Sequence, residues 1–378
     1  MRSTSSTRRR RTGGPSGRAV VCITGASGLI GTRLAQNLVP DYKVIGLDVK
    51  EPPESFPDAA RFVACDLTSQ RSTREAIQEI RGPLEHPIAS VVHLAAYYDF
   101  LGEPSSLYEE LTVKGTERLL RALQEGALPE QLLFSSSLLV MMPSEGEPLT
   151  ESSPIQAEWA YPRSKLEAEA VLEKSRGEIP CVVLRLAGVY DEGGHSPPIT
   201  QQIWRIRERT LESFLFPGDA SRGQSFVHLD DAVRCIRAAI ERRGQLPALD
   251  RFLVGEPDVM SYGELQDRIG ELLHGHEWPT VRIPARLPKA GAWAKEATPL
   301  AEASFIKPWM IDLADAHYPI RIQRARTRLA WEPEHRIRDV LPRMIEQLQA
   351  DPAAWYQENG LPIRDRQAHG GAHARNRG

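Results

Sequence analysis

Short apolar segments rich in β-branched residues alternate with amphipathic segments along much of this chain, and this alternation limits the folds available to it. The first segment, AVVCIT (19–24), is continuously apolar, which is typical of a parallel strand buried on both faces. Repeated strand–helix units predict an α/β fold with a doubly wound parallel sheet and right-handed crossovers. We expect the further strands at 43–47, 61–64, 90–95, 131–135 and 181–186, and the helices at 29–38, 73–80, 106–124 and 159–174.

The regular alternation ends near residue 190. The chain beyond it is richer in Pro and Trp and mixes short strands with helices, which indicates a second, smaller unit. Residues 1–18 carry six arginines and no acid, a composition that predicts a disordered basic tail. We therefore expect a nucleotide-binding domain at 19–190, a C-terminal substrate-binding lobe at 191–350 with some segments returning to the main sheet, and a C-terminal extension and tail at 351–378.

Charge and cysteine content exclude several classes of protein. The 378 residues include 47 Lys and Arg against 50 Asp and Glu, so no overall positive field attracts nucleic acid. No apolar run approaches the roughly 18 residues of a membrane span. The four cysteines form no CxxC pair, so we expect neither a metal site nor a disulfide framework. We expect a cytoplasmic protein, because the cytoplasm keeps thiols reduced. The Arg- and Ser-rich start leaves organellar targeting open.

Three glycines follow the first predicted strand directly and open the first predicted helix, in the sequence Gly25-Ala26-Ser27-Gly28-Leu29-Ile30-Gly31. Glycine permits a tight turn, a close approach of the backbone to a pyrophosphate, and close packing of helix on strand. The amino end of the helix then stabilises the phosphate charge. The spacing is GxxGxxG rather than GxGxxG. The loop therefore indicates dinucleotide binding, and glycines that only form a turn are the alternative.

An acidic residue, Asp48, ends the second predicted strand, 17 residues after Gly31. A carboxylate at this place can accept hydrogen bonds from the ribose hydroxyls of a dinucleotide. It also repels a 2′-phosphate, so we expect NAD rather than NADP, although Lys50 lies close by. A solvent-exposed Asp at a strand end is the alternative interpretation.

Hydroxyl groups and a lysine form the second candidate site. Tyr161 and Lys165 lie four residues apart on a predicted helix and therefore share one of its faces. A nearby ammonium lowers the pKa of a phenol, which then serves as an acid or base at working pH. Ser135, Ser136 and Ser137 leave a predicted buried strand, at the edge where open α/β sheets bind ligands. A solvated helix face and serines that only cap backbone groups are the alternatives.

In this order, these motifs resemble the extended short-chain dehydrogenase/reductase superfamily, and within it the NAD-dependent epimerase/dehydratase family. The resemblance covers about residues 19–350 and implies a Rossmann-type fold. The motifs that carry it are TGASGLIG (24–31), Asp48, CDL (65–67), HLAA (93–96), VKGT (113–116), FSSS (134–137), YPRSK (161–165), LRLAGVY (184–190), FVHLDDAV (226–233) and RARTRLAWEP (324–333).

The resemblance also implies the roles of individual residues. Tyr161 would be the catalytic acid/base, Lys165 would hold the nicotinamide ribose, and Ser137 would hydrogen-bond the reacting oxygen. Asp66 and Leu67 would flank the adenine. The remaining residues expected to contact NAD are Gly25, Ser27, Gly28, Leu29, Ile30, Gly31, Asp48, Leu94, Ala95, Ala96, Ser135 and Leu186, together with Tyr161 and Lys165 themselves.

The expected function is NAD-dependent oxidoreduction of a small molecule, with Tyr/Lys-assisted hydride transfer at a secondary alcohol or ketone. A nucleotide-sugar epimerase or dehydratase, which transfers the hydride only transiently, is the alternative. A non-catalytic dinucleotide-sensing regulator is disfavoured, because such relatives commonly lose the Tyr/Lys pair. A homodimer is an expectation by analogy alone.

Two departures from the family pattern bear on the substrate. Gly188 stands where nucleotide-sugar members usually have Asn, and Gln224 stands where they usually have Arg. Both changes remove groups that bind a nucleotide diphosphate, and Arg222 and Arg282 are the residues that could replace them. The segment AYYDFLG (96–102) is similar to the hydroxysteroid-dehydrogenase and dihydroflavonol-reductase-like branch.

Overall fold

The computed structural model describes residues 17–82, 87–99, 103–283 and 315–363. Most of the expected basic tail (1–18) and residues 364–378 of the expected C-terminal tail lie outside these ranges. Within the described ranges, no helix combines the length and the apolarity that crossing a membrane requires.

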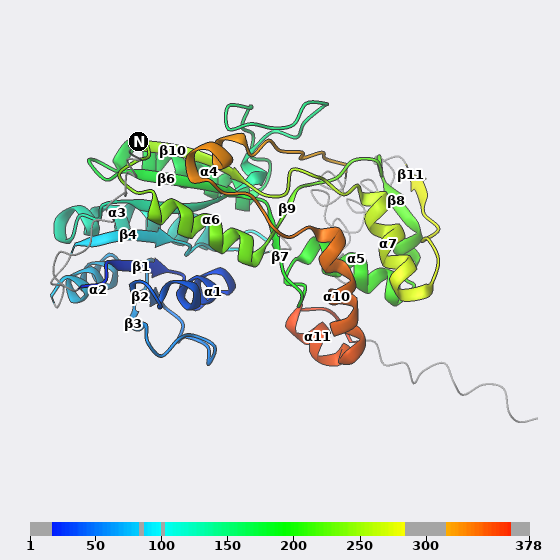
Figure 1. Cartoon of the computed structure of the whole chain (residues 1–378), viewed down its shortest axis with the longest axis horizontal. Helices are drawn as coiled ribbons and strands as arrows, with labels where there is room; N and C mark the ends of the chain where they lie inside the picture. Colours follow the sequence, from blue (N-terminus) through cyan, green and yellow to red (C-terminus); the bar gives the residue numbers. More distant parts are fainter. Residues whose placement is uncertain (1–16, 83–86, 100–102, 284–314, 364–378) are drawn as a thin grey trace, which may run out of the picture.

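Seven parallel strands form the central sheet, in the order β10-β6-β5-β4-β1-β2-β3 (Figure 1). The predicted α/β, doubly wound Rossmann-type sheet is confirmed. Strand β1 lies between β2 and β4, so the chain order reverses beside it, and ligands of open α/β sheets bind at the carboxyl edge of such a point. The strands are β1 (Val20–Thr24), β2 (Lys43–Asp48), β3 (Arg61–Ala64), β4 (Ile88–His93), β5 (Leu132–Ser137), β6 (Cys181–Leu186) and β10 (Leu249–Val254).

Helices cover both faces of this sheet (Figure 1). Helices α1 and α6 pack together on one face, over one apolar core, and α2, α3 and α4 pack side by side over a second core on the other. Burial on both faces explains why the strands read as continuous apolar runs. The helices are α1 (Leu29–Leu38), α2 (Gln70–Arg81), α3 (Lys114–Gly126), α4 (Ala160–Ser175) and α6 (Leu229–Glu241).

The structure differs from the expectation of one uninterrupted helix over 106–124. A π-helical turn, η1 (Tyr108–Val113), precedes α3. The hydroxyl of Thr112 in this turn accepts the backbone N–H of Tyr97, and its carbonyl accepts the hydroxyl of Thr116. These contacts hold the wider turn against the loop after β4, and such turns often lie near functional sites.

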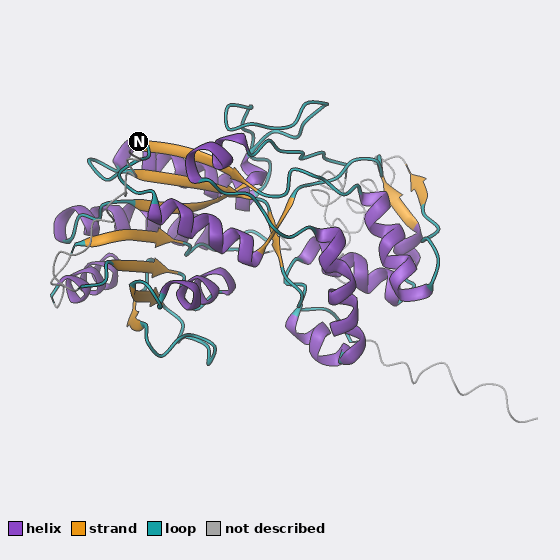
Figure 2. Cartoon of the chain, in the orientation of Figure 1, coloured by secondary structure: helices purple, strands orange, loops and turns teal. Residues whose placement is uncertain are grey.

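A second, mostly helical group of elements lies beside the sheet (Figure 2). It has its own apolar core, to which Ile203, Ile269 and Met344 contribute. It comprises α5 (Pro197–Arg207), α7 (Tyr262–His274), α10 (Ile337–Ala350), α11 (Pro352–Glu358) and the paired strands β8 (Leu215–Pro217) and β11 (Val281–Ile283). Strands β7 (Gly188–Tyr190) and β9 (Phe226–His228) pair with each other, and short turns lie at η2 (Leu138–Val140), η3 (Leu211–Phe214) and η4 (Ala325–Leu329).

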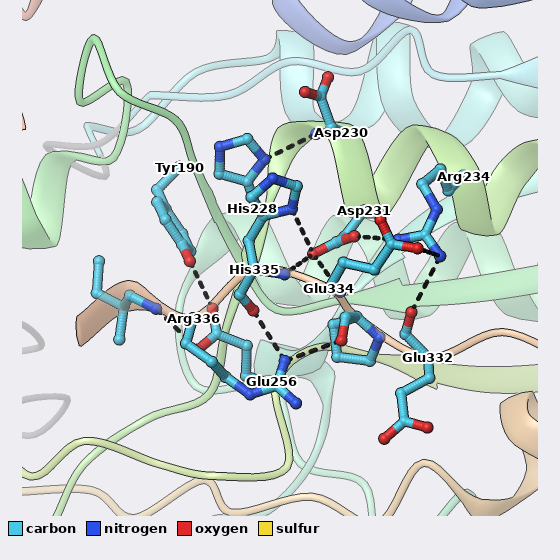
Figure 3. Close-up of polar contacts among 12 residues, drawn as sticks. Tyr190, His228, Asp230, Asp231, Arg234, Glu256, Glu332, Glu334, His335 and Arg336 are labelled. Carbon is cyan, nitrogen blue, oxygen red and sulfur yellow. Dashed lines mark hydrogen bonds and ion pairs between the residues drawn. The ribbon is translucent and has the colours of Figure 1, made fainter. Parts of the chain in front are cut away.

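A buried polar network connects the FVHLDDAV segment to the chain that leads into α10 (Figure 3). The carboxylate of Asp231 is fully buried, pairs with Arg234 at 2.6 Å and accepts the backbone N–H of His335 at 2.8 Å. The carboxylate of Glu256 accepts the hydroxyl of Tyr190 at 2.7 Å. Because buried polar groups are costly to leave unpaired, this network fixes how the second group of elements meets the sheet.

A buried ion pair anchors α4 to the sheet. Glu169 of α4 and Arg185 of β6 approach to 2.7 Å, and each side chain is 3% exposed. Glu169 also accepts the hydroxyl of Ser136 at 2.5 Å, and Arg185 lies 2.8 Å from the sulfur of Met141. The pair therefore ties one helix to two neighbouring strands.

Replacing Glu169 with Ala should lower the free energy of unfolding by about 3–5 kcal/mol, because it leaves the guanidinium of Arg185 buried without its charge partner. Urea denaturation measures this loss. Glu173→Ala is the matched control: Glu173 lies one turn further along α4, is mostly exposed, and pairs with Arg251 at 2.8 Å. Its removal should cost at most about 1 kcal/mol. Equal losses in the two variants would contradict the anchoring role.

Candidate active site

A cavity of about 510 Å³ follows the carboxyl ends of β1, β4, β5 and β6. It runs from the glycine loop to the start of α4, so the topology brings together residues that are far apart in the sequence. Of the site residues expected from the sequence, the cavity is lined by Gly25, Gly28, Leu29, Ile30, Gly31, Leu94, Ala96, Ser135, Ser137, Tyr161, Lys165 and Leu186. Ser27, Asp48, Asp66, Leu67 and Ala95 do not line it.

Glycine stands at the three positions of the loop for different structural reasons. Gly25 has a φ of +73°, and a Cβ there would lie 2.8 Å from the backbone nitrogen of Ala95. A Cβ on Gly31 would collide with the carbonyl oxygen of Gly25, which is why α1 can pack this closely on the loop. A Cβ on Gly28 would meet only that same oxygen, at 3.4 Å. Internal packing therefore requires glycine at 25 and 31, whereas Gly28 leaves space toward the cavity.

The amino end of α1 is available to a ligand. Gly28 is its N-cap residue, and no side chain of the described residues caps this end. Leu29 and Ile30, the first helical residues, line the cavity. The unsatisfied N–H groups and the positive end of the helix dipole suit an anionic group. With the open space at Gly28, these observations fit the pyrophosphate of a dinucleotide.

The acidic residue at the end of β2 contacts the glycine loop. The carboxylate of Asp48 accepts the backbone N–H groups of Ser27 and Lys50, each at 3.1 Å. Further along the same edge, after β3, the Asp66 carboxylate accepts both the backbone N–H and the hydroxyl of Thr68. Leu67 is buried there. Ala95, beside the loop, donates its N–H to the hydroxyl of Thr24 at 3.4 Å.

Tyr161 lies in the first turn of α4, where Pro162 is tolerated because its missing N–H would have no partner in the helix. Its phenol forms a hydrogen bond with Ser137 at the end of β5. The hydroxyl oxygen of Ser137 also accepts the backbone N–H of Leu139 at 3.2 Å. The ring of Tyr98 packs edge-on against that of Tyr161, with centroids 4.9 Å apart.

Lys165 lies one turn later on the same helix face and is buried. Its ammonium donates to the carbonyl oxygen of Ser135 at 2.7 Å and lies 6.0 Å from the centroid of the Tyr161 ring. Burial lowers the pKa of Lys165 to about 7, and the negative charge of Glu169 acts in the opposite direction. The pKa of this amine is therefore set by the balance between its burial and the nearby carboxylate of Glu169.

The structure differs from the expectation that Lys165 lowers the pKa of the phenol. Burial raises the pKa of Tyr161 to about 12, and the hydrogen bond with Ser137 acts in the opposite direction. The i,i+4 spacing placed the two side chains on one face correctly, but it carries no information about desolvation, which is the larger effect here. The phenol consequently holds its proton at neutral pH.

Sequence reasoning missed a large part of the cavity wall. Trp159 lies only two residues before Tyr161, so its proximity was a usable signal, and the segment 195–198 begins five residues after the end of the LRLAGVY motif. The lining residues that were not singled out include Leu138, Leu139, Trp159, Ala187, Val189, His195, Ser196, Pro197, Pro198 and Ser225.

Known proteins are similar to this chain in sequence and in architecture. A model of the NAD dependent epimerase/dehydratase family matches residues 21–255. Short-chain dehydrogenase/reductase family 42E member 1 of Bos taurus is 28% identical over 302 residues, which cover 74% of this chain and 73% of the relative.

Two solved structures have the same fold. The UDP-glucose 4-epimerase of Thermotoga maritima, determined with UDP-glucose, has a TM-score of 0.64 at 20% identity and covers 88% of this chain and 99% of its own. The dTDP-glucose 4,6-dehydratase of Bacillus anthracis, in complex with NAD, has a TM-score of 0.66 at 17% identity. It covers 90% of this chain and 99% of its own.

The family match spans more than half of the chain, so the resemblance drawn from the sequence motifs is confirmed, and NAD as the expected cofactor is confirmed at the level of the family. The chain belongs to the NAD dependent epimerase/dehydratase family of the extended short-chain dehydrogenases/reductases.

Proposed function

We propose that this protein is an NAD-dependent oxidoreductase that interconverts a secondary alcohol and a ketone. One observation carries the proposal: the hydroxyl pair of Ser137 and Tyr161 and the buried ammonium of Lys165 line the same cavity as the glycine loop. A proton donor, a second hydrogen-bond donor and a cation thus stand at the α4 end of the cavity that begins at the glycine loop.

Different residues along the carboxyl edge of the sheet would hold different parts of NAD. The first turn of α1 and Gly28 would take the pyrophosphate, Asp48 the adenosine ribose, and Asp66 with Leu67 the adenine. Leu94, Ala96 and Leu186 would contact the nicotinamide half, whose ribose Lys165 would hold. When bound, NADH supplies the hydride for the carbonyl carbon, and NAD⁺ accepts it in the reverse reaction.

Proton transfer is the task of this chain's own residues. Because the pKa of Tyr161 is raised to about 12, its phenol is protonated at neutral pH and can donate its proton to the carbonyl oxygen of a ketone. Ser137 would donate a hydrogen bond to the same oxygen. The ammonium of Lys165 would then stabilise the phenolate that remains, until the phenolate takes a proton from solvent.

A nucleotide-sugar epimerase or dehydratase is the second candidate, favoured by the fold shared with the sugar-nucleotide enzymes named above. It would use the same residues without net change of the cofactor. Net oxidation of NADH by added ketones, followed by absorbance at 340 nm, separates the two: the proposed function requires stoichiometric oxidation of NADH.

Gly28→Val should abolish binding of NAD⁺ while the fold survives. The packing leaves space for a Cβ at this position, but the remaining methyl groups would occupy the path of the pyrophosphate. Calorimetric titration with NAD⁺ measures binding, and thermal denaturation measures stability. Gly146→Val, at a loop position with open space around it, is the control and should bind NAD⁺ normally. Unchanged affinity in Gly28→Val would remove the loop from the NAD site.

Asp48→Ala should weaken NAD⁺ binding roughly tenfold and reduce the preference over NADP⁺, because a charged hydrogen-bond acceptor and a repulsion of the 2′-phosphate are lost together. Asp48→Asn keeps an acceptor for the N–H of Ser27 and removes only the charge, so it should lose discrimination more than affinity. Dissociation constants for both dinucleotides decide the matter, with exposed Asp58→Ala as control. A wild-type protein that prefers NADP⁺ contradicts this role.

Tyr161→Phe should lower kcat by at least about 100-fold, since positioned acid–base catalysis contributes ~10²–10⁴-fold, and should leave NADH affinity nearly unchanged. Lys165→Met should reduce both, and the double variant should be little worse than the worse single variant. Steady-state kinetics with a ketone that the wild-type protein reduces measure kcat, and titrations with NADH measure its affinity. Tyr42→Phe, at a tyrosine before β2, is the control. Near-wild-type turnover in Tyr161→Phe would refute the proposed acid/base role of Tyr161, and only the proposal that this site binds NAD would stand.

A further inference from the structure

The surface of the cavity is predominantly apolar. We call the outer cavity the part of its wall formed by Tyr98, Leu139, Trp159, Val189, Pro198 and Tyr318, of which Tyr98 packs against Tyr161. Three of these residues are aromatic, and flat apolar rings are complementary to flat apolar ligands. Tyr98 is 53% exposed although its ring contacts Tyr161, so apolar surface at the mouth is available for burial by a ligand.

The cations that line the whole cavity are already engaged by the protein. Within the described residues they are Lys165, which donates to the carbonyl oxygen of Ser135, and His195, whose Nδ1 lies 2.7 Å from the carboxylate of Asp191. Asp99 also lines the cavity and adds a negative charge. In the outer cavity, away from the amino end of α1, the described lining residues therefore offer a diphosphate no free cation for the charge-assisted hydrogen bonds that offset its desolvation.

The two arginines that could have replaced the missing diphosphate-binding groups are used elsewhere. Arg222 donates to the carbonyl oxygen of Asp315 and lies 3.7 Å from its carboxylate. Arg282 lies 3.7 Å from the carboxylate of Asp219 and is mostly exposed. Neither lines the cavity.

The wall at Gly188 is closed to a larger polar side chain. A Cβ on this residue would lie 2.9 Å from Cδ1 of Phe226, a buried ring. Nearby, Gln224 is buried and lines the cavity, so the polar group offered to a ligand there is a neutral amide. An amide can donate to or accept from a neutral oxygen, but it brings no charge for a phosphate.

We propose that the outer cavity takes an uncharged, predominantly apolar ring compound bearing the reacting carbonyl or hydroxyl, and that it rejects nucleoside diphosphate sugars. This inference rests on the proposed function, because it names the substrate class of the same site. The reaction adds one hydride, from NADH, to the carbonyl carbon and one proton, from Tyr161, to its oxygen.

Calorimetric titration of the NAD⁺-saturated protein tests this. The ketones are titrated without turnover, because neither NAD⁺ nor a ketone can donate a hydride. UDP lacks the hexose that could donate a hydride to NAD⁺ and is the turnover-free nucleotide probe, and UDP-glucose is titrated beside it. The probes are cyclohexanone and 2-decalone on one side, and UDP and UDP-glucose on the other. We expect 2-decalone to bind at least tenfold more tightly than UDP or UDP-glucose, with a negative heat-capacity change. Equal or tighter binding of either nucleotide, or no binding of either ketone, overturns the inference.

A charge introduced at Gln224, which lines the cavity and pairs through its backbone with Tyr318 of the outer cavity, provides the second test. Gln224→Arg should strengthen UDP binding and weaken 2-decalone binding, so that the ratio of the two dissociation constants shifts at least tenfold. Gln245→Arg adds the same charge at an exposed position and should leave the ratio unchanged. Should Gln224→Arg not fold, the wild-type comparison still decides.

These titrations measure binding alone, so their outcome is separate from that of the proposed function. Failure of the proposed function would instead be seen as the absence of net NADH oxidation with any added ketone.

Discussion

Helix α4 is held against the sheet by buried polar contacts, and the site depends on them. Lys165 donates to the carbonyl oxygen of Ser135, and one turn later Glu169 binds Ser136 and Arg185. These contacts fix the rotation and register of the helix relative to β5, so that Tyr161, one turn before Lys165, meets Ser137. The same burial that makes the anchoring strong also lowers the pKa of Lys165 and raises that of Tyr161. Anchoring and proton chemistry therefore have a common physical origin.

Local sequence signals predicted the framework well. Helix α1 begins and ends where the glycine loop and the apolar pattern indicated, at Leu29–Leu38, and the buried strands were recognisable as short apolar runs. The π-helical turn before α3 was not predictable, because apolar periodicity does not separate a single wider turn from an ordinary one. Glu169 and Arg185 were missed since charged residues on a helix and a strand are usually exposed; only the tertiary packing buries both.

The composition of the candidate site was predicted in part, and its electrostatics were not predicted. The motifs named Ser137, Tyr161 and Lys165, and the topology brings them to one cavity. Their pKa values follow from desolvation, which depends on how many atoms surround each group and cannot be counted along a sequence. The outer cavity was hidden for a related reason: Trp159, Val189 and Tyr318 belong to three separate segments, and their shared wall exists only in the folded chain.

Hydride transfer with net change of the cofactor is the central claim, and isotopic labelling measures it directly. NADH deuterated at the transferring C4 position, incubated with a ring ketone and the purified protein, should yield an alcohol with one deuterium on the carbinol carbon. Mass spectrometry should find one labelled alcohol for each NADH oxidised. An alcohol without deuterium, or conversion of a nucleotide sugar with no net oxidation of NADH, would contradict the account.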